Sequence, residues 1–103
     1  MKARKLKTVT KREWQSFIDV MTSITEQCSR MRAAARGQGK TTVPASEYWE
    51  MHDRFEKVAG SVLGEKRRFW ESREAFFSRV AALCSKPEEM ISTMARNGIQ
   101  LRF

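Results

Sequence analysis

Two stretches of the chain repeat apolar side chains at alternating spacings of three and four residues, the spacing of one face of an α-helix. In the first stretch these positions are Trp14, Phe17, Met21, Ile24, Cys28, Met31 and Ala35. In the second they are Tyr48, Met51, Phe55, Val58 and Val62, followed at seven-residue steps by Phe69, Phe76 and Leu83. The pattern predicts two long helices, over residues 11–36 and 46–84.

Local signals place the ends of these helices. Thr10 and Glu13 have the spacing of a capping box, which begins the first helix, and Gly37 lies where that helix ends. Gly60 and Gly64 lie inside the second predicted helix, where they mark either a bend or a close contact with a neighbouring segment. Whether the second helix is continuous between them is left open.

The C-terminal part of the chain predicts one more helix. A second capping box, from Ser85 to Glu88, begins a short helix over 86–97, and Gly98 is suited to its left-handed end. The loop between the two long helices is long enough for them to fold back antiparallel. We therefore predict an all-α fold for one domain, 1–103: a helical hairpin and a short C-terminal helix, after a basic arm over 1–10.

The aromatic side chains exceed what this hairpin can bury, because the second helix overhangs the first by roughly four turns. We expect a homodimer, most simply a two-fold helical bundle. Packing in the core is expected for Trp14, Phe17, Phe55 and Phe69, which occupy the seam. The side chains predicted to contact a second copy or another protein are Trp49, Trp70, Phe76, Phe77 and Val80.

The chain is strongly basic, with 20 Lys and Arg against 12 Asp and Glu and a net charge of +8. Residues 1–12 contain six of these cations and no acidic residue. Counting back from the turn places Lys11 and Arg12 beside Phe69 and Trp70, close to a second basic cluster over 66–68. This distribution favours anionic partners, with nucleic acid first among them.

The first functional hypothesis is a small protein that binds DNA or double-stranded RNA mainly through the phosphate backbone. The predicted phosphate contacts are Lys2, Arg4, Lys5, Lys7, Lys11, Arg12, Lys66, Arg67 and Arg68. The second hypothesis is an inhibitor or adaptor that binds a larger protein through an aromatic and basic surface.

The sequence does not predict an enzyme. Residues 34–41, AARGQGKT, fit a relaxed phosphate-loop pattern, but they follow a predicted helix instead of a strand. We interpret them as a helix end and a basic loop. His52 has no nucleophile or second base placed to work with it, so it is expected at the surface. Cys28 and Cys84 lack metal-ligand spacing and are expected to be reduced core residues.

We therefore expect no catalytic residues, metal, cofactor or small-molecule substrate. The longest apolar runs are only a few residues, so neither a membrane span nor a secretory signal is expected. The predicted location is the cytoplasm.

Overall fold

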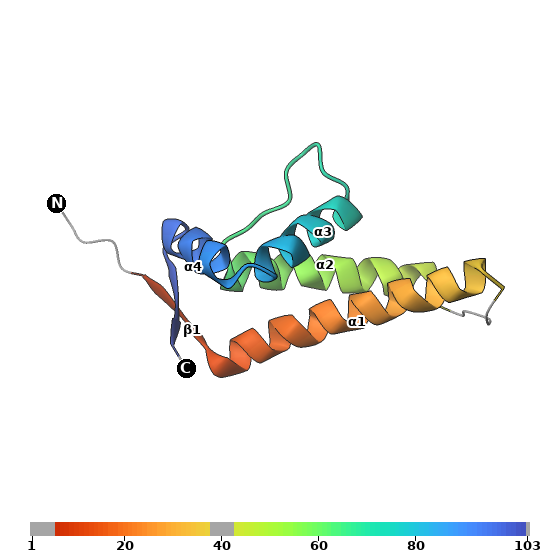
Figure 1. Cartoon of the computed structure of the whole chain (residues 1–103), viewed down its shortest axis with the longest axis horizontal. Helices are drawn as coiled ribbons and strands as arrows, with labels where there is room; N and C mark the ends of the chain where they lie inside the picture. The colour runs from red at the N-terminus through yellow and green to blue at the C-terminus, as the bar shows by residue number, and fades with distance from the viewer. Residues whose placement is uncertain (1–5, 38–42, 103) are drawn as a thin grey trace.

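The protein is mostly helical, with four helices and two short strands among the residues that the structure describes. The structure is a computed structural model, and it describes residues 6–37 and 43–102. The order of elements is β1 (Lys7–Thr10), α1 (Lys11–Ala35), α2 (Ala45–Val62), α3 (Arg73–Cys84), α4 (Pro87–Arg96) and β2 (Ile99–Arg102) (Figure 1). The expectation of an all-α protein therefore holds for most of the fold, and the pair of strands is the exception.

Helices α1 and α2 lie side by side and run in opposite directions (Figure 1). The predicted capping box begins α1: the Thr10 hydroxyl accepts from the Glu13 amide at 3.2 Å, and the Glu13 carboxylate accepts from the Thr10 amide at 3.4 Å. The rings of Phe17 and Phe55 stack between the helices with their centroids 5.8 Å apart, and both side chains are fully buried. The apolar seams of both helices thus face each other.

The prediction of one helix over 46–84 left its continuity between Gly60 and Gly64 open. The structure has two helices there, separated by residues 63–72. The chain leaves the helical path at Gly64, whose φ of +71° favours glycine. A Cβ atom at this position would lie 2.5 Å from Cβ of Asn97. The Asn97 side chain also donates to the Leu63 carbonyl at 2.8 Å. Gly64 therefore ends α2 where the chain passes close to Asn97.

Helix α3 folds back onto α2 instead of extending it (Figure 1). The Ser72 hydroxyl caps α3 by accepting from the Ala75 amide at 3.1 Å. Ring centroids of Phe76 and Phe77 lie 5.7 Å and 5.0 Å from that of Phe55 on α2. The overhang expected from the sequence is thus absent, and the reason for expecting a dimer is lost with it.

The N-terminal segment was expected to be an arm, but residues 7–10 form a strand. β1 pairs in parallel with β2, with Lys7 opposite Ile99 and Thr10 opposite Arg102. The Val9 side chain is fully buried, so this segment belongs to the core. β-branched residues at positions 8–10 suit a strand, which explains the local preference.

Helix α4 links α3 to β2 and closes one end of the core. It places Met90 and Met94 inside, and Gly98, with a φ of +75°, ends it in the predicted left-handed manner. The buried apolar side chains form a single cluster drawn from every element: Val9, Phe17, Val20, Ile24, Phe55, Ala59, Val62, Leu63, Phe76, Val80, Met90, Met94 and Ile99.

Candidate functional site

Among the described residues, the most exposed aromatic side chains lie on the α2–α3 loop, residues 63–72, which extends away from the helices (Figure 1). Phe69 is 95% exposed and Trp70 66% exposed. Their rings are nearly perpendicular, with centroids 4.9 Å apart, and the Arg68 guanidinium lies 5.7 Å from the Trp70 ring centroid. We call Arg68, Phe69 and Trp70 the aromatic tip. The prediction that Phe69 packs in the core is wrong, because its seam position falls after the break at Gly64.

Arg79 on α3 forms hydrogen bonds and ion pairs with residues of the α2–α3 loop. Its guanidinium contacts Glu71 twice, from Nε to Oε2 at 2.8 Å and from Nη2 to Oε1 at 3.0 Å. It also donates to the Glu65 carboxylate at 3.0 Å and to the Lys66 carbonyl at 3.1 Å. The hydrogen bonds from Arg79, followed by that from the Arg68 amide, lower the pKa of Glu71 to about 2. Arg79, Glu65 and Glu71 form what we call the Arg79 network.

A second set of contacts joins the loop to α2. The Arg67 guanidinium pairs with Glu56 at 2.6 Å and donates to the Glu71 carbonyl at 3.1 Å. The hydrogen bond to Glu56 raises the pKa of Arg67. Arg73, at the start of α3, pairs with Asp53 at 3.1 Å. Arg67 was predicted to contact phosphate, but in this structure its charge is already paired.

Two cations of the loop stay available to a ligand. Lys66 and Arg68 are exposed, and neither makes an ion pair with a carboxylate among residues 6–37 and 43–102. Lys66 precedes Phe69 by three residues, and Arg68 directly precedes it. The loop therefore presents positive charge and open ring faces together.

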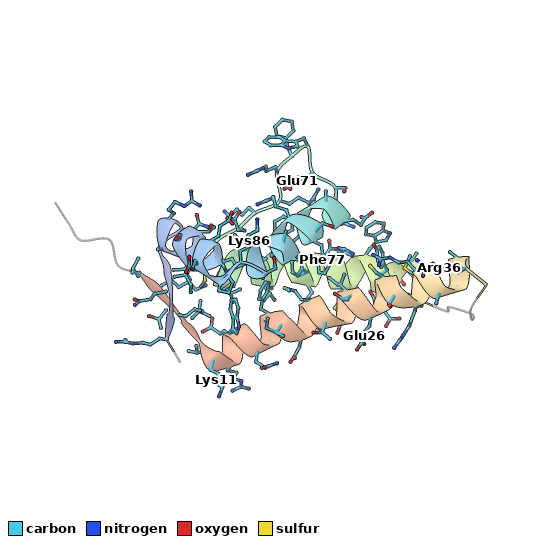
Figure 2. All side chains as sticks on the ribbon, viewed as in Figure 1. Lys11, Glu26, Arg36, Glu71, Phe77 and Lys86 are labelled. Carbon is cyan, nitrogen blue, oxygen red and sulfur yellow. The ribbon has the colours of Figure 1, made fainter. Side chains whose placement is uncertain are left out.

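The remaining predicted phosphate contacts do not gather at this loop. Lys11 and Arg12 are exposed at the start of α1. Figure 2 shows Lys11 on the opposite side of the molecule from Glu71. The predicted proximity of this basic segment to the aromatic tip is therefore wrong. The Lys7 ammonium donates to the carbonyl and the hydroxyl of Ser61, each at 2.8 Å. Lys2, Arg4 and Lys5 lie outside the described residues.

The predicted partner-contacting side chains divide into accessible and buried groups. Phe76 and Val80 are fully buried within the chain, and Phe77 is half-buried against Phe55 and His52. They therefore offer little surface to a partner. Trp49 is 38% exposed, with the Arg73 guanidinium 5.3 Å from its ring centroid. Trp70 is the predicted contact that the structure leaves most open.

His52 is buried, contrary to the expectation of a surface histidine. It is 1% exposed, and the rings of Tyr48 and Phe77 lie edge-on to it with centroids 4.6 Å and 6.0 Å away. Neither ring nitrogen has a hydrogen-bond partner among the described residues, and burial lowers the pKa of His52. His52 lines a pocket of about 330 Å³ that also contains Cys28 and Glu74. Burial within a cluster of aromatic rings thus disfavours the protonated imidazole.

The two cysteines are free and half-buried, and burial raises the pKa of the Cys84 thiol to about 11. No group of three or more His, Cys, Asp or Glu side chains within the described part of the chain could hold a metal ion.

The segment that resembles a phosphate loop begins inside α1, which ends at Ala35, and Gly37 follows with a φ of +72°. Residues 38–41 of that segment lie outside the described residues. No described helix is long and apolar enough to cross a bilayer.

Comparisons with known proteins give no match: no family model fits the sequence, and no curated protein or solved structure is similar to it. The α2–α3 loop is therefore interpreted from its own chemistry. Sequence reasoning identified its cations and Trp70 but missed the exposure of Phe69. It also missed the Arg79 network, whose members are brought together only by the fold.

Proposed function

We propose that the protein binds nucleic acid through the α2–α3 loop, and that its other cations add long-range attraction. The observation that carries this proposal is that one projecting loop has both exposed rings, Phe69 and Trp70, and cations without an ion pair in the described part of the chain, Lys66 and Arg68. Cations that neutralise phosphates, next to aromatic side chains that stack on bases, are the two components of many nucleic-acid-binding surfaces.

The net charge of +8 supports a polyanionic partner. Lys11 and Arg12 are exposed without an ion pair among the described residues, as are Arg54 and Lys57 on α2. Positive charge is therefore spread over several sides of the molecule. Such a distribution attracts DNA or RNA from any direction, while the loop supplies the local contacts.

The proposal is tested by measuring binding of a fluorescent oligonucleotide between 50 and 200 mM salt, by anisotropy. The double variant Lys66→Gln with Arg68→Gln should weaken binding and reduce the slope of log affinity against log salt by about 1.4 to 1.8. Each lost phosphate contact accounts for about 0.7 on single strands and about 0.9 on duplex DNA.

The matched control is Arg54→Gln with Lys57→Gln, which removes the same charge from α2. It should change the slope much less, because neither residue lies on the α2–α3 loop. No measurable binding by the intact protein at 50 mM salt, or equal effects of both double variants, would contradict the proposal.

A second candidate function is an adaptor or inhibitor that inserts the aromatic tip into a larger protein. The observation that favours it is the residue types of the tip, since Trp and Arg dominate protein–protein hot spots. In that case the intact protein would bind no oligonucleotide, and Phe69→Ala would abolish binding to the protein partner.

The homodimer expected from the sequence stays a prediction. Because Phe76 and Val80 are buried in one chain, two copies would have to meet through exposed apolar side chains such as Met31, Trp49 and Ile91. Sedimentation equilibrium measures the oligomeric state. If two copies meet through Ile91, Ile91→Asp should dissociate them; if the protein is a monomer, the variant should stay a monomer.

A further inference from the structure

The aromatic tip is fixed in an outward position by contacts on both sides of it. After the tip, the Glu71 carboxylate accepts from the Arg68 amide at 2.9 Å and is held twice by Arg79. Before the tip, Arg67 is tied to Glu56 on α2. The Glu71 amide also donates to the Arg68 carbonyl at 3.0 Å, which closes the turn around Phe69 and Trp70. Hydrogen bonds and ion pairs therefore constrain the backbone on both sides of the two rings.

This arrangement leaves the Phe69 side chain 95% exposed and the Trp70 side chain 66% exposed. A side chain of the size of phenylalanine gains about 1.5–3 kcal/mol when it is fully buried, and Phe69 is 95% exposed. The contacts of Arg79 and Arg67 hold the loop in the position in which Phe69 is exposed. A preorganised contact surface loses less conformational entropy when it binds, so the ring faces are ready for a planar partner.

The charge beside the rings identifies that partner. Lys66 and Arg68 are unpaired among the described residues, and the only carboxylate next to the rings in the chain, Glu71, is neutralised by Arg79. A ligand that brings a planar ring and a negative charge together satisfies both features. In a duplex the faces of bases are covered by their neighbours, so only bases outside a stack offer a free face.

We propose that the aromatic tip is a stacking site for unpaired bases of single-stranded nucleic acid, with Lys66 and Arg68 contacting the adjoining phosphates. This inference rests on the proposed function and makes it narrower. It differs from the expectation from sequence, in which phosphate contacts to a duplex sufficed. DNA and RNA offer the same faces and phosphates, so the experiment tests both.

The experiment compares four labelled probes in one buffer: oligothymidine of about a dozen nucleotides, oligouridine of equal length, an oligothymidine in which most bases are replaced by abasic sites, and a fully paired duplex. The abasic strand keeps the phosphates and removes the rings that stack. The intact protein should bind oligothymidine or oligouridine about tenfold or more tightly than the abasic strand. Oligothymidine and oligouridine differ in the sugar and in the C5 methyl group of the base, so the stronger of the two shows which of these strands the site prefers.

The double variant Phe69→Leu with Trp70→Leu keeps apolar volume but removes both rings. It should abolish the preference for bases while leaving affinity for the abasic strand and the duplex within about twofold. Trp70→Phe, which keeps a ring, should retain most of the preference. The matched control is Trp49→Leu, which removes a partly exposed tryptophan from α2 and should retain the preference in full.

The positioning role of Arg79 is tested by Arg79→Gln, with circular dichroism to confirm that the protein remains folded. This variant should lower the preference for oligothymidine over the abasic strand severalfold, because the rings stay present but lose their fixed position. Affinity for the abasic strand should fall less.

Equal affinity of the intact protein for oligothymidine and the abasic strand would overturn the inference and leave the proposed function standing on phosphate contacts. An equal loss of affinity for all four probes in the double leucine variant would also overturn it. No binding to any probe would instead reject the proposed function itself.

Discussion

Arg79 and Glu71 form a bidentate ion pair, with N–O distances of 2.8 Å and 3.0 Å, that joins α3 to the residue directly after the aromatic tip. The same carboxylate accepts from the Arg68 amide at 2.9 Å, directly before the two exposed rings. One carboxylate therefore links α3 to the chain on both sides of Phe69 and Trp70. Arg79 thus holds, through Glu71, the backbone that carries the two exposed rings.

The first prediction concerns the amide of Arg68, whose hydrogen bond depends on the position of Glu71. Arg79→Gln removes both contacts to that carboxylate, so the Arg68 amide should exchange with solvent deuterium markedly faster than in the intact protein. The control is Arg96→Gln on α4, whose guanidinium contacts the Thr93 hydroxyl and should not affect the loop. Unchanged exchange at Arg68 would show that Arg79 does not hold the tip.

The ion pair between Arg79 and Glu71 depends on pH. The folded-state pKa of Glu71, about 2, lies below its ordinary value of 4.5, so ionised Glu71 favours the folded loop. Its stabilising effect should be complete above pH 4.5 and disappear as the pH falls toward 2. Slow exchange of the Arg68 amide, corrected for the intrinsic pH dependence of exchange, should therefore persist at pH 4.5. Loss of that protection already at pH 6 would contradict this assignment.

The break between α2 and α3 predicts opposite effects at two glycines. Gly64→Ala should destabilise the protein by more than about 1 kcal/mol, because its φ is +71° and the new Cβ would collide with Asn97. Gly60→Ala should stabilise it by up to about 1 kcal/mol, because Gly60 is helical and the nearest atom to its Cβ is 3.8 Å away. Urea unfolding measures both. Similar effects of the two substitutions would argue for a continuous helix.

Alanine substitution at two phenylalanines of the same seven-residue series should have very different effects on the free energy of unfolding. Phe76→Ala removes a fully buried ring and should cost about 3–5 kcal/mol of unfolding free energy. Phe69→Ala removes a ring that is 95% exposed and should change it by less than about 0.5 kcal/mol. Thermal unfolding distinguishes the two, and a large cost at Phe69 would mean that this ring is buried.

His52 predicts a loss of stability in mild acid. Burial lowers its folded-state pKa below the ordinary value of 6.5, so protonation favours the unfolded chain. Its contribution to stability is complete above pH 6.5 and decreases as the pH falls below that value. The variant His52→Phe, which keeps a ring and removes both unpartnered nitrogens, should be at least as stable at pH 7 and lose less stability between pH 7 and 5. An equal loss in both proteins would contradict this account, since His52 is the only histidine.

Much of the helical structure could be predicted from the sequence because it depends on neighbours along the chain. The apolar spacing of α1 and α2 and the Thr10–Glu13 capping box are local signals. The continuation past Gly64 was predicted wrongly because Phe69 and Phe76 keep the seven-residue spacing by coincidence of composition. β1 and β2 were missed because each has four residues and their pairing joins the two ends of the chain.

The candidate site was predictable only in its chemistry. The run of cations over 66–68 and Trp70 stands out in any reading of the sequence. The exposure of Phe69 depends on the reversal at Gly64, and the Arg79 network depends on α3 folding back, so both required the tertiary structure. The one sequence signal for the exposure of Phe69 was the run of cations over 66–68, because an aromatic residue that directly follows three cations is rarely in a core.

The indole signals of the three tryptophans test most directly whether the α2–α3 loop binds nucleic acid. In an ¹H–¹⁵N spectrum, Trp14, Trp49 and Trp70 each contribute one side-chain N–H signal, and single Trp→Phe variants assign them. During titration with oligothymidine or oligouridine, the account predicts that the Trp70 signal shifts while the Trp14 signal, from a side chain packed against the core, stays in place. A Trp70 signal that stays in place at every concentration of both strands would contradict binding of nucleic acid by the α2–α3 loop.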